Sequence, residues 1–182
     1  MSEVGEELAD RLRAHIRDVP DFPRPGIDFK DITPLLADHA TFAATVDALA
    51  APHRKSAIDV VAGIEARGFV LGAPVALILH AGFAPVRKKG KLPGSTVEAS
   101  YALEYGRAVL EVTADAFSPG ARVLVVDDVL ATGGTAAATV DLVRRCGAEV
   151  VAVSFLMELE FLAGRAALAA VGIDAPHVLL RV

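Results

Sequence analysis

A buried strand that runs directly into two carboxylates and a glycine turn constrains this chain more than any other feature. Residues 122–126 are mostly β-branched and show no polar alternation, which is typical of a strand covered on both faces. Asp127 and Asp128 follow, and residues 131–135 read Ala-Thr-Gly-Gly-Thr before a helical pattern begins. The segment therefore predicts a strand, a tight turn and a helix, which is one unit of an α/β fold.

Two further segments repeat this order of strand and helix. Residues 58–64 predict a buried strand that leads into a helix over residues 69–81. Residues 150–155 predict another, followed by a helix over about residues 158–170. The helix after the glycine turn covers about residues 135–146. Strands that alternate with helices predict a mainly parallel sheet flanked by helices.

The remaining segments predict a hairpin and an N-terminal helix. Residues 101–105 and 108–112 alternate in polarity around a Gly-Arg pair, which predicts an antiparallel hairpin. Residues 1–17 predict an amphipathic helix, and the prolines and glycine of residues 21–26 end it. Because no repeat, linker or shift in composition divides the chain, we expect one domain over residues 1–182.

Composition excludes several classes of protein. Hydrophobic residues make up 53% of the 182 residues and charged residues 23%, unlike a disordered chain. A formal net charge of -5 disfavours a general nucleic-acid-binding surface. The single cysteine, Cys146, excludes a disulfide framework and a multi-cysteine zinc site. No apolar run is long enough to cross a membrane, and the acidic N-terminus is unlike a targeting peptide. We expect a cytoplasmic protein without nucleic-acid or membrane partners.

The glycine turn has the chemistry of a phosphate-binding loop. Glycines let several backbone N–H groups approach one anion, and the start of a helix adds unpaired donors and the positive end of its dipole. Thr132 and Thr135 can add hydroxyl donors, while the preceding carboxylates suit sugar hydroxyls or metal-bound water. The loop has neither the Walker A pattern nor the dinucleotide fingerprint. An ordinary strand-to-helix turn and the phosphoacceptor aspartate of a response regulator are the alternatives.

Residues 123–135 resemble the motif that binds phosphoribosyl diphosphate (PRPP) in type I phosphoribosyltransferases. The resemblance implies that family's α/β fold, with a mainly parallel sheet flanked by helices, an antiparallel hairpin, a flexible catalytic loop and a small N-terminal hood formed by about residues 1–35. It also implies Mg²⁺ as cofactor, bound through PRPP and waters with no direct protein ligand. It assigns the ribose hydroxyls to Asp127 and Asp128, and the 5′-phosphate to Ala131, Thr132, Gly133, Gly134 and Thr135.

Four further segments resemble the adenine-specific members of the family. Residues 21–36 are similar to their N-terminal signature, and residues 63–69 to their pyrophosphate loop. Residues 86–94 are similar to their mobile catalytic loop, and residues 100–106 to the hairpin after it. The resemblance covers about residues 21–160. It implies a homodimeric enzyme of purine salvage that converts adenine and PRPP into AMP and pyrophosphate.

The resemblance gives roles to several charged side chains. Arg67 follows a strand at a Gly-containing turn, where a guanidinium can meet a diphosphate; a surface ion pair is the alternative. The one dense basic cluster includes Arg87, Lys88 and Lys91, which the resemblance assigns to PRPP; a solvated loop is the alternative. The resemblance makes Glu104 the acid/base for the purine proton, although a lone hairpin glutamate is usually solvated. Arg67 and Glu104 are therefore the predicted catalytic residues, beneath a lid over about residues 88–99.

The resemblance assigns adenine to the segment around Phe29. The matching phenylalanine of the family stacks on the purine, and backbone groups beside it, here those of Asp28 and Lys30, read the base edge. Leu130 would cover the other face of the ring. Family members often carry arginine where Lys30 stands, which matters little for a backbone contact. A core aromatic is the alternative for Phe29.

Two rival functions follow from the same motif. A non-catalytic PRPP-sensing repressor would need a DNA-binding module, for which 182 residues leave no room. A phosphoribosyltransferase for a 6-oxopurine would have to read a keto group where adenine carries an amine. The segment around residues 21–31 favours adenine.

Overall fold

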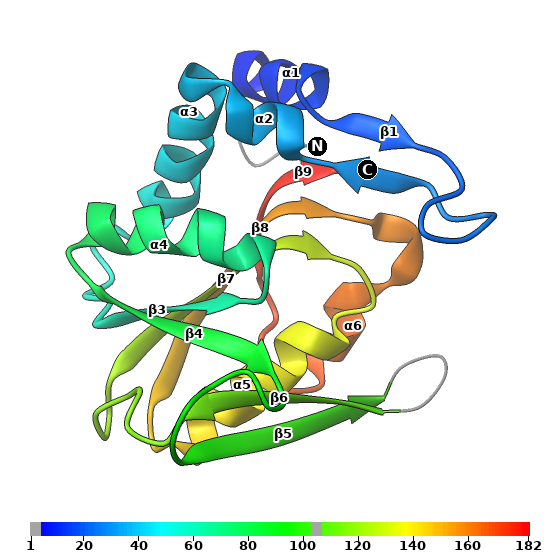
Figure 1. Ribbon diagram of the computed structural model, residues 1–182. Coiled ribbons are helices and arrows are strands. Elements are labelled where there is room, and N and C mark those ends of the chain that lie inside the picture. Colours follow the sequence, from blue (N-terminus) through cyan, green and yellow to red (C-terminus); the bar gives the residue numbers. More distant parts are fainter. Residues whose placement is uncertain (1–4, 103–106) are drawn as a thin grey trace.

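A seven-stranded sheet forms the centre of the computed structural model, which describes residues 5–102 and 107–182 (Figure 1). Its strands are β3 (Val60–Ile64), β4 (Gly82–Lys88), β5 (Thr96–Ala102), β6 (Arg107–Thr113), β7 (Arg122–Leu130), β8 (Glu149–Glu158) and β9 (His177–Arg181). The strand order is β5-β6-β4-β3-β7-β8-β9. The neighbouring strands β4, β3, β7, β8 and β9 pair in parallel. Strand β6 pairs antiparallel with both β4 and β5. The predicted parallel sheet and antiparallel hairpin are confirmed.

Helices cover both faces of this sheet (Figure 1). They are α1 (Glu6–Ala14), α2 (Thr33–Ala37), α3 (His39–Ala50), α4 (Arg67–Leu79), α5 (Gly134–Arg145) and α6 (Gly164–Ala169), with 3₁₀ turns η1 (Ala51–His53) and η2 (Glu160–Leu162). A separate two-stranded antiparallel sheet joins β1 (Arg17–Val19) to β2 (Phe29–Asp31). Within the described ranges, no helix combines the length and the apolar character that crossing a bilayer requires.

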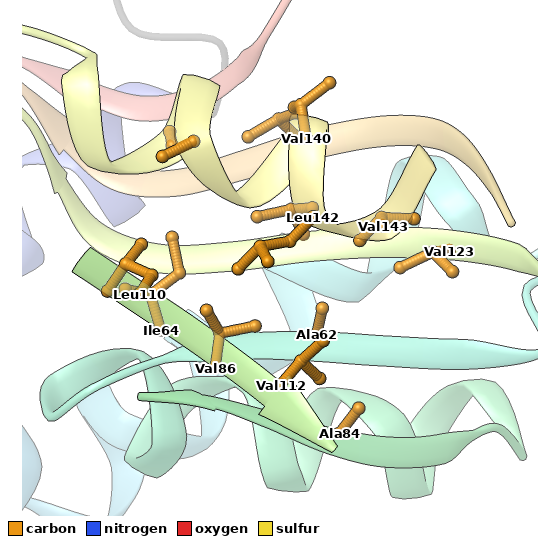
Figure 2. Close-up of a cluster of buried hydrophobic side chains, with 14 of the residues drawn as sticks. Ala62, Ile64, Ala84, Val86, Leu110, Val112, Val123, Val140, Leu142 and Val143 are labelled. Atoms are coloured by element: carbon orange, nitrogen blue, oxygen red, sulfur yellow. The ribbon is translucent and has the colours of Figure 1, made fainter. Parts of the chain in front are cut away.

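The apolar run of β7 is explained by the two cores on either side of it. Val123 and Val125 belong to the cluster beneath α5, whereas Leu124 and Val126 belong to the cluster beneath α4. All four are 0% exposed. Figure 2 shows Val140 of α5 and its neighbours lying over the sheet in the first cluster. Because side chains alternate between two covered faces, a polar residue has no exposed face to occupy along this stretch.

Two strands run further than the apolar pattern predicts. β7 continues through Asp127 and Asp128, and β8 continues to Glu158, where Leu130 pairs with Glu158 in register. The predicted helix over residues 158–170 is therefore too long. Only η2 and the short α6 form there, separated by Ala163 in the left-handed region at φ 52.

The N-terminal segment is more structured than its sequence predicts. The predicted helix over residues 1–17 is shorter as α1, because Arg17 already pairs with Asp31 in the β1–β2 sheet. The prolines of residues 21–26 lie in the loop between these strands. This sheet projects on the side of the molecule where β7 and β8 end (Figure 1).

A buried histidine couples the stability of this fold to pH. The Nε2 atom of His53 lies 2.8 Å from the Ser154 hydroxyl oxygen, and its ring packs edge-to-face on His177. Burial, and then the charge of His177, lowers the pKa of His53 from 6.5 to about 4. The native state therefore resists protonation of His53 between these two values.

The free energy of unfolding is expected to fall as the pH drops from about 6.5 to about 4, because the unfolded chain then binds a proton that folded His53 does not. Urea unfolding at several pH values measures this dependence in the wild type, in His53→Gln, and in His39→Gln as an exposed control. The dependence should be weaker in His53→Gln and unchanged in His39→Gln. Equal dependence in all three proteins would contradict this assignment.

Candidate active site

A cavity of about 450 Å³ lies beside the carboxyl ends of β3 and β7. Ligands commonly bind at this edge of a parallel sheet, because the loops that leave the strands converge there. The lining comes from the loop after β3, from the start of α4, from β4, β5, β6 and β7, and from the first turn of α5: Glu65, Ala66, Arg67, Lys88, Tyr101, Leu110, Asp127, Asp128, Val129 and Thr135. Five of the predicted site residues therefore meet at one cavity.

Two carboxylates and a guanidinium form the polar centre of the cavity. Asp128 is 5% exposed and accepts a hydrogen bond from Nε of Arg67, the first residue of α4. The Oδ1 atom of Asp127 accepts the backbone N–H of Asp128 at 2.9 Å. Burial, followed by the charge of Asp128, raises the pKa of Asp127 well above its usual value, and the charge of Arg67 opposes that rise. The carboxylates can accept hydroxyl hydrogen bonds, and the remaining N–H groups of Arg67 can meet an anion.

The predicted phosphate loop is held tightly from behind. Gly133 has φ 79 and precedes α5, whose first turn receives no side-chain cap from the described residues. A Cβ on Gly133 would collide with the carbonyl oxygen of Gly164, and a Cβ on Gly164 would collide with that of Ala131. The loop and the start of α6 therefore approach backbone to backbone. The first N–H groups of α5, like those of any helix, have no partner within the helix and can meet an anion.

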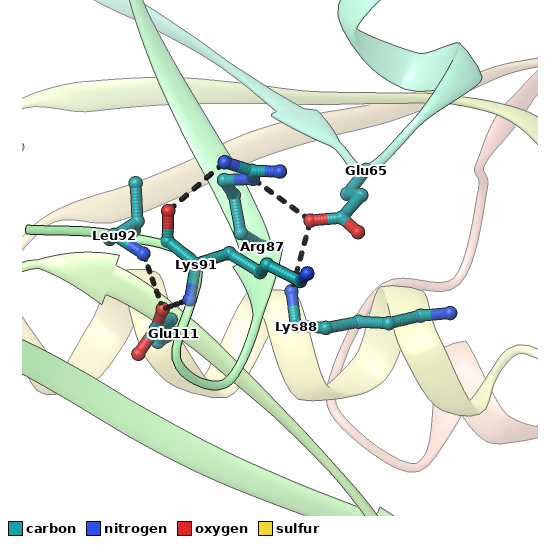
Figure 3. Close-up of polar contacts among 6 residues, drawn as sticks. All are labelled: Glu65, Arg87, Lys88, Lys91, Leu92 and Glu111. Carbon is teal, nitrogen blue, oxygen red and sulfur yellow. Dashed lines mark hydrogen bonds and ion pairs between the residues drawn. The ribbon is translucent and has the colours of Figure 1, made fainter.

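The basic cluster is divided between the cavity and a hydrogen-bond network, which Figure 3 shows. Lys88 lines the cavity, and its backbone N–H lies 3.3 Å from the Glu65 carboxylate. Arg87 donates from Nε to the same carboxylate at 2.9 Å and from a terminal nitrogen to the carbonyl oxygen of Lys91 at 3.0 Å. The guanidinium of Arg87 is therefore engaged by the chain itself, beside the loop that carries Arg67.

The predicted base-binding segment reaches the cavity through Arg67. Phe29 lies on β2, where its ring is 5.2 Å from the guanidinium carbon of Arg67 and packs edge-to-face on Phe22. The amino group of Lys30 contacts Asp18 at 2.6 Å and Asp28 at 2.9 Å. These two hydrogen bonds, that of Asp18 first, raise the pKa of Lys30. Its side chain therefore fastens β2 to the chain before it.

Other predicted positions are distributed differently. Thr135 lines the cavity, whereas Thr132 is exposed. Leu130 is 1% exposed and packs in the core cluster beneath α5, while its neighbour Val129 lines the cavity. Glu104 lies outside the described residues.

Tyr101 of β5 and Leu110 of β6 line the cavity without having been predicted to do so. Alternating polarity predicts the hairpin strands. Their contact with the cavity depends on the pairing of β6 with β4, which joins segments far apart in the sequence.

Comparisons with known proteins identify the family of this chain. The phosphoribosyl transferase domain family matches residues 35–165. An adenine phosphoribosyltransferase from a Nocardioides species is 66% identical over 162 residues, 87% of this chain and 88% of its own. One from Acidothermus cellulolyticus is 61% identical over 169 residues, 93% of each chain.

Solved structures extend the likeness from sequence to fold. The adenine phosphoribosyltransferase of Rhodothermus marinus aligns with a TM-score of 0.90 at 49% identity, over 98% of this chain and 100% of its own. That of Saccharomyces cerevisiae, complexed with an imino-altritol bisphosphate and adenine, aligns at 0.86 with 39% identity, over 96% and 98%. Since the family match spans residues 35–165 and the likeness in sequence and fold spans nearly the whole length, this chain belongs to the phosphoribosyltransferase family and, within it, to the adenine phosphoribosyltransferases.

Proposed function

We propose that this protein transfers the 5-phosphoribosyl group of PRPP to adenine, giving AMP and pyrophosphate. The observation that carries the proposal is the meeting, at one cavity, of the β7 carboxylates, the start of α5 and Arg67. These groups suit the three polar parts of PRPP: the ribose hydroxyls, the 5′-phosphate and the diphosphate. Relatives named adenine phosphoribosyltransferases, one of them solved with adenine, support adenine as the base.

Two neighbouring elements would hold the ribose phosphate. Asp127 and Asp128 would accept hydrogen bonds from the ribose hydroxyls, while Ala131, Thr132, Gly133, Gly134 and Thr135 would hold the 5′-phosphate. Both sets follow one another on β7 and at the start of α5, so one rigid unit fixes the sugar. Fixing the sugar lets N9 of adenine meet C1 in line with the departing oxygen. Holding the reactants in this geometry accelerates the reaction.

The leaving group requires positive charge. The C1–oxygen bond would break early, so the transition state should resemble a ribosyl oxocarbenium ion, and pyrophosphate would leave as a multiply charged anion. Arg67 and Lys88 lie in the cavity and would stabilise that anion. We also assign Arg87 and Lys91 to PRPP, since they lie on either side of Lys88 in the same basic segment.

The donor set of the cavity suits Mg²⁺. Mg²⁺ prefers oxygen ligands, keeps several waters and is usually held by one or two carboxylates together with substrate phosphates. Asp127 and Asp128 offer carboxylate oxygens at the cavity, so we expect them to hold the ion through waters, with PRPP supplying its direct ligands. When bound, Mg²⁺ neutralises charge on the diphosphate.

The base would be held against β2. Phe29 would stack on adenine while backbone groups of Asp28 and Lys30 read its edge, and Leu130 would cover the other face. Glu104 would take up the proton that adenine releases from its imidazole ring. A lid over about residues 88–99 would exclude water, with β5 beginning at Thr96 as its fixed end.

The proposal is tested by offering the protein PRPP and Mg²⁺ with adenine, hypoxanthine, guanine or xanthine, and measuring nucleotide formed. AMP from adenine alone is the expected result. Turnover of a 6-oxopurine instead would keep the PRPP site and overturn the assignment of the base. PRPP binding without turnover of any base would favour a PRPP sensor.

We propose further that the chain works as a homodimer, as a single domain over residues 1–182, and in the cytoplasm. Val70 and Leu77 on α4 and Phe83 on β4 are exposed apolar side chains, with Leu77 77% exposed, which supports an interface between copies. Light scattering on the wild type and Leu77→Asp tests the dimer, and the variant is expected to dissociate.

The two core clusters share one sheet, which supports a single domain. The lone cysteine suits a reducing compartment.

A further inference from the structure

Glu111 of β6 is a buried carboxylate that accepts hydrogen bonds from the segment between β4 and β5 and from the side chain of Thr96. Glu111 is only 3% exposed. Its Oε1 atom accepts the backbone N–H groups of Lys91 at 2.7 Å and Leu92 at 2.8 Å. A carboxylate buried without partners is strongly unfavourable, so these donors are what allow an acidic residue at this position.

The electrostatics of Glu111 agree with this geometry. Burial by itself would raise the pKa of Glu111, but hydrogen bonds from the backbone N–H groups of Leu92, Gly90 and Lys91 lower it below its usual value. Gly90 has φ 83, so the chain turns there and directs successive N–H groups toward one point. The ionised carboxylate thus favours the turned form of residues 90–92.

The same turn is held from its other side by Arg87. The carbonyl oxygen of Lys91 accepts from Arg87, whose Nε donates to Glu65. Both backbone polar groups of Lys91 are therefore satisfied by side chains from neighbouring strands or loops (Figure 3). A continuous chain of contacts runs from β6 through the turn and β4 to the loop that precedes Arg67.

We propose that Glu111 is a positioning residue for PRPP: its carboxylate fixes the turn at residues 90–92, and so holds the basic segment beside the cavity. The proposal rests on the proposed function, since it assigns that basic segment to PRPP. Lys88 already lines the cavity, and Lys91 extends from the anchored turn. Without the anchor, PRPP would have to order the turn as it binds. The conformational entropy lost in ordering the turn would weaken the binding of PRPP.

The neighbouring strand supplies a matched control. Glu98 of β5 is the register partner of Glu111, yet its side chain is 39% exposed and forms an ion pair with the side chain of Lys89 at 2.9 Å. It touches the same segment at the end of a flexible side chain and leaves the backbone of the turn unanchored. A general effect of removing a glutamate from the hairpin would appear at both positions.

The test compares Glu111→Leu, Glu111→Gln and Glu98→Leu with the wild type in two assays. Steady-state kinetics give KM for PRPP and KM for adenine separately. Trypsin digestion of the native proteins, followed by mass spectrometry, gives the rate of cleavage after Lys91, a readout that needs no activity. Circular dichroism and thermal unfolding establish that each variant is folded at the assay temperature.

Glu111→Leu is expected to raise KM for PRPP about tenfold, to leave KM for adenine within about twofold, and to speed cleavage after Lys91 by a similar factor. Glu111→Gln keeps an acceptor oxygen and should lie between it and the wild type. Glu98→Leu leaves the backbone of the turn bonded to Glu111, so it should be cleaved after Lys91 at the wild-type rate. If Glu111→Leu does not fold, the Gln variant carries the same test.

Cleavage and KM for PRPP at wild-type values in a folded Glu111 variant would overturn the proposal, as would equal effects in Glu98→Leu. Inactivity of the wild type with adenine would count against the proposed function. Unchanged cleavage in the Glu111 variants would count against the anchor alone.

Discussion

Replacing Arg67 by alanine is expected to lower kcat/KM for PRPP by about two to three orders of magnitude, the size seen when one preorganised donor to a developing anion is removed. The side chain lies in the cavity and shares a hydrogen bond with Asp128. The variant therefore loses a partner for the diphosphate. It also leaves the nearly buried carboxylate of Asp128 without that bond.

The pH dependence of the Arg67 variants separates these two losses. The charge of Arg67 lowers the pKa of Asp127, so its removal raises that pKa further. The acidic limb of kcat/KM should move to higher pH in Arg67→Ala, because protonated Asp127 accepts ribose hydroxyls poorly. Arg67→Lys should return the acidic limb to its wild-type pH, because the positive charge is kept. It should restore only part of kcat/KM, since an ammonium lacks the planar, two-pronged donor geometry of a guanidinium.

Arg54 provides the control for a lost arginine, because its ion pair with Asp47 is exposed. Arg54→Ala should have wild-type kinetics. Near-normal turnover of Arg67→Ala across the pH range would remove Arg67 from the active site.

Local sequence was sufficient to predict the strands that are buried on both faces. The run at residues 122–126 predicts β7 because burial on both faces requires an apolar side chain at every position of the strand. It could not predict that β7 continues through Asp127 and Asp128, since aspartate is unfavourable in strands when judged alone. Pairing with β8 carries the strand onward, and the cavity accommodates the charges.

Contacts between distant segments account for most of what the sequence could not predict. β1 and β2 are three residues each, too short for a periodic signal, and exist because they pair with each other. The bond between Arg67 and Asp128 joins residues 61 positions apart. The motif predicts both side chains at the site, but only the parallel pairing of β3 with β7 brings them into contact.

The assignment of Leu130 to adenine stays a prediction, because the motif that makes it supplies chemistry without orientation. Leu130 follows the carboxylates in the motif, which assigns it to adenine. In the structure it packs under Gly164, and Val129 lines the cavity. Which of two adjacent apolar residues faces the cavity depends on the twist of the strand end, and the sequence does not specify that.

The contact between the phosphate loop and α6 gives the second large effect. Gly164→Ala is expected to lower kcat/KM for PRPP by about 10²-fold, because the added Cβ would collide with the carbonyl oxygen of Ala131 and lie 2.8 Å from Leu130 Cδ1. The backbone has to yield, and Ala131 is the start of the loop assigned to the 5′-phosphate. Overpacking should also lower the free energy of unfolding by about 1–3 kcal/mol. Thermal unfolding separates this loss from the kinetic one.

Gly133→Ala approaches the same contact from the other side. Its Cβ would meet the carbonyl oxygen of Gly164 and lie 2.9 Å from Ala167 Cβ, and its φ of 79 adds backbone strain. Gly82→Ala is the control, because its Cβ would make only an ordinary contact, 3.6 Å from the carbonyl oxygen of Asp59. Both loop variants should raise KM for PRPP and weaken AMP binding by calorimetry, while Gly82→Ala changes neither. A folded Gly164→Ala protein with wild-type affinity for PRPP and AMP would mean that the loop tolerates displacement from α6. The phosphate would then have to be held by side chains, because the backbone of this turn would no longer be fixed in place.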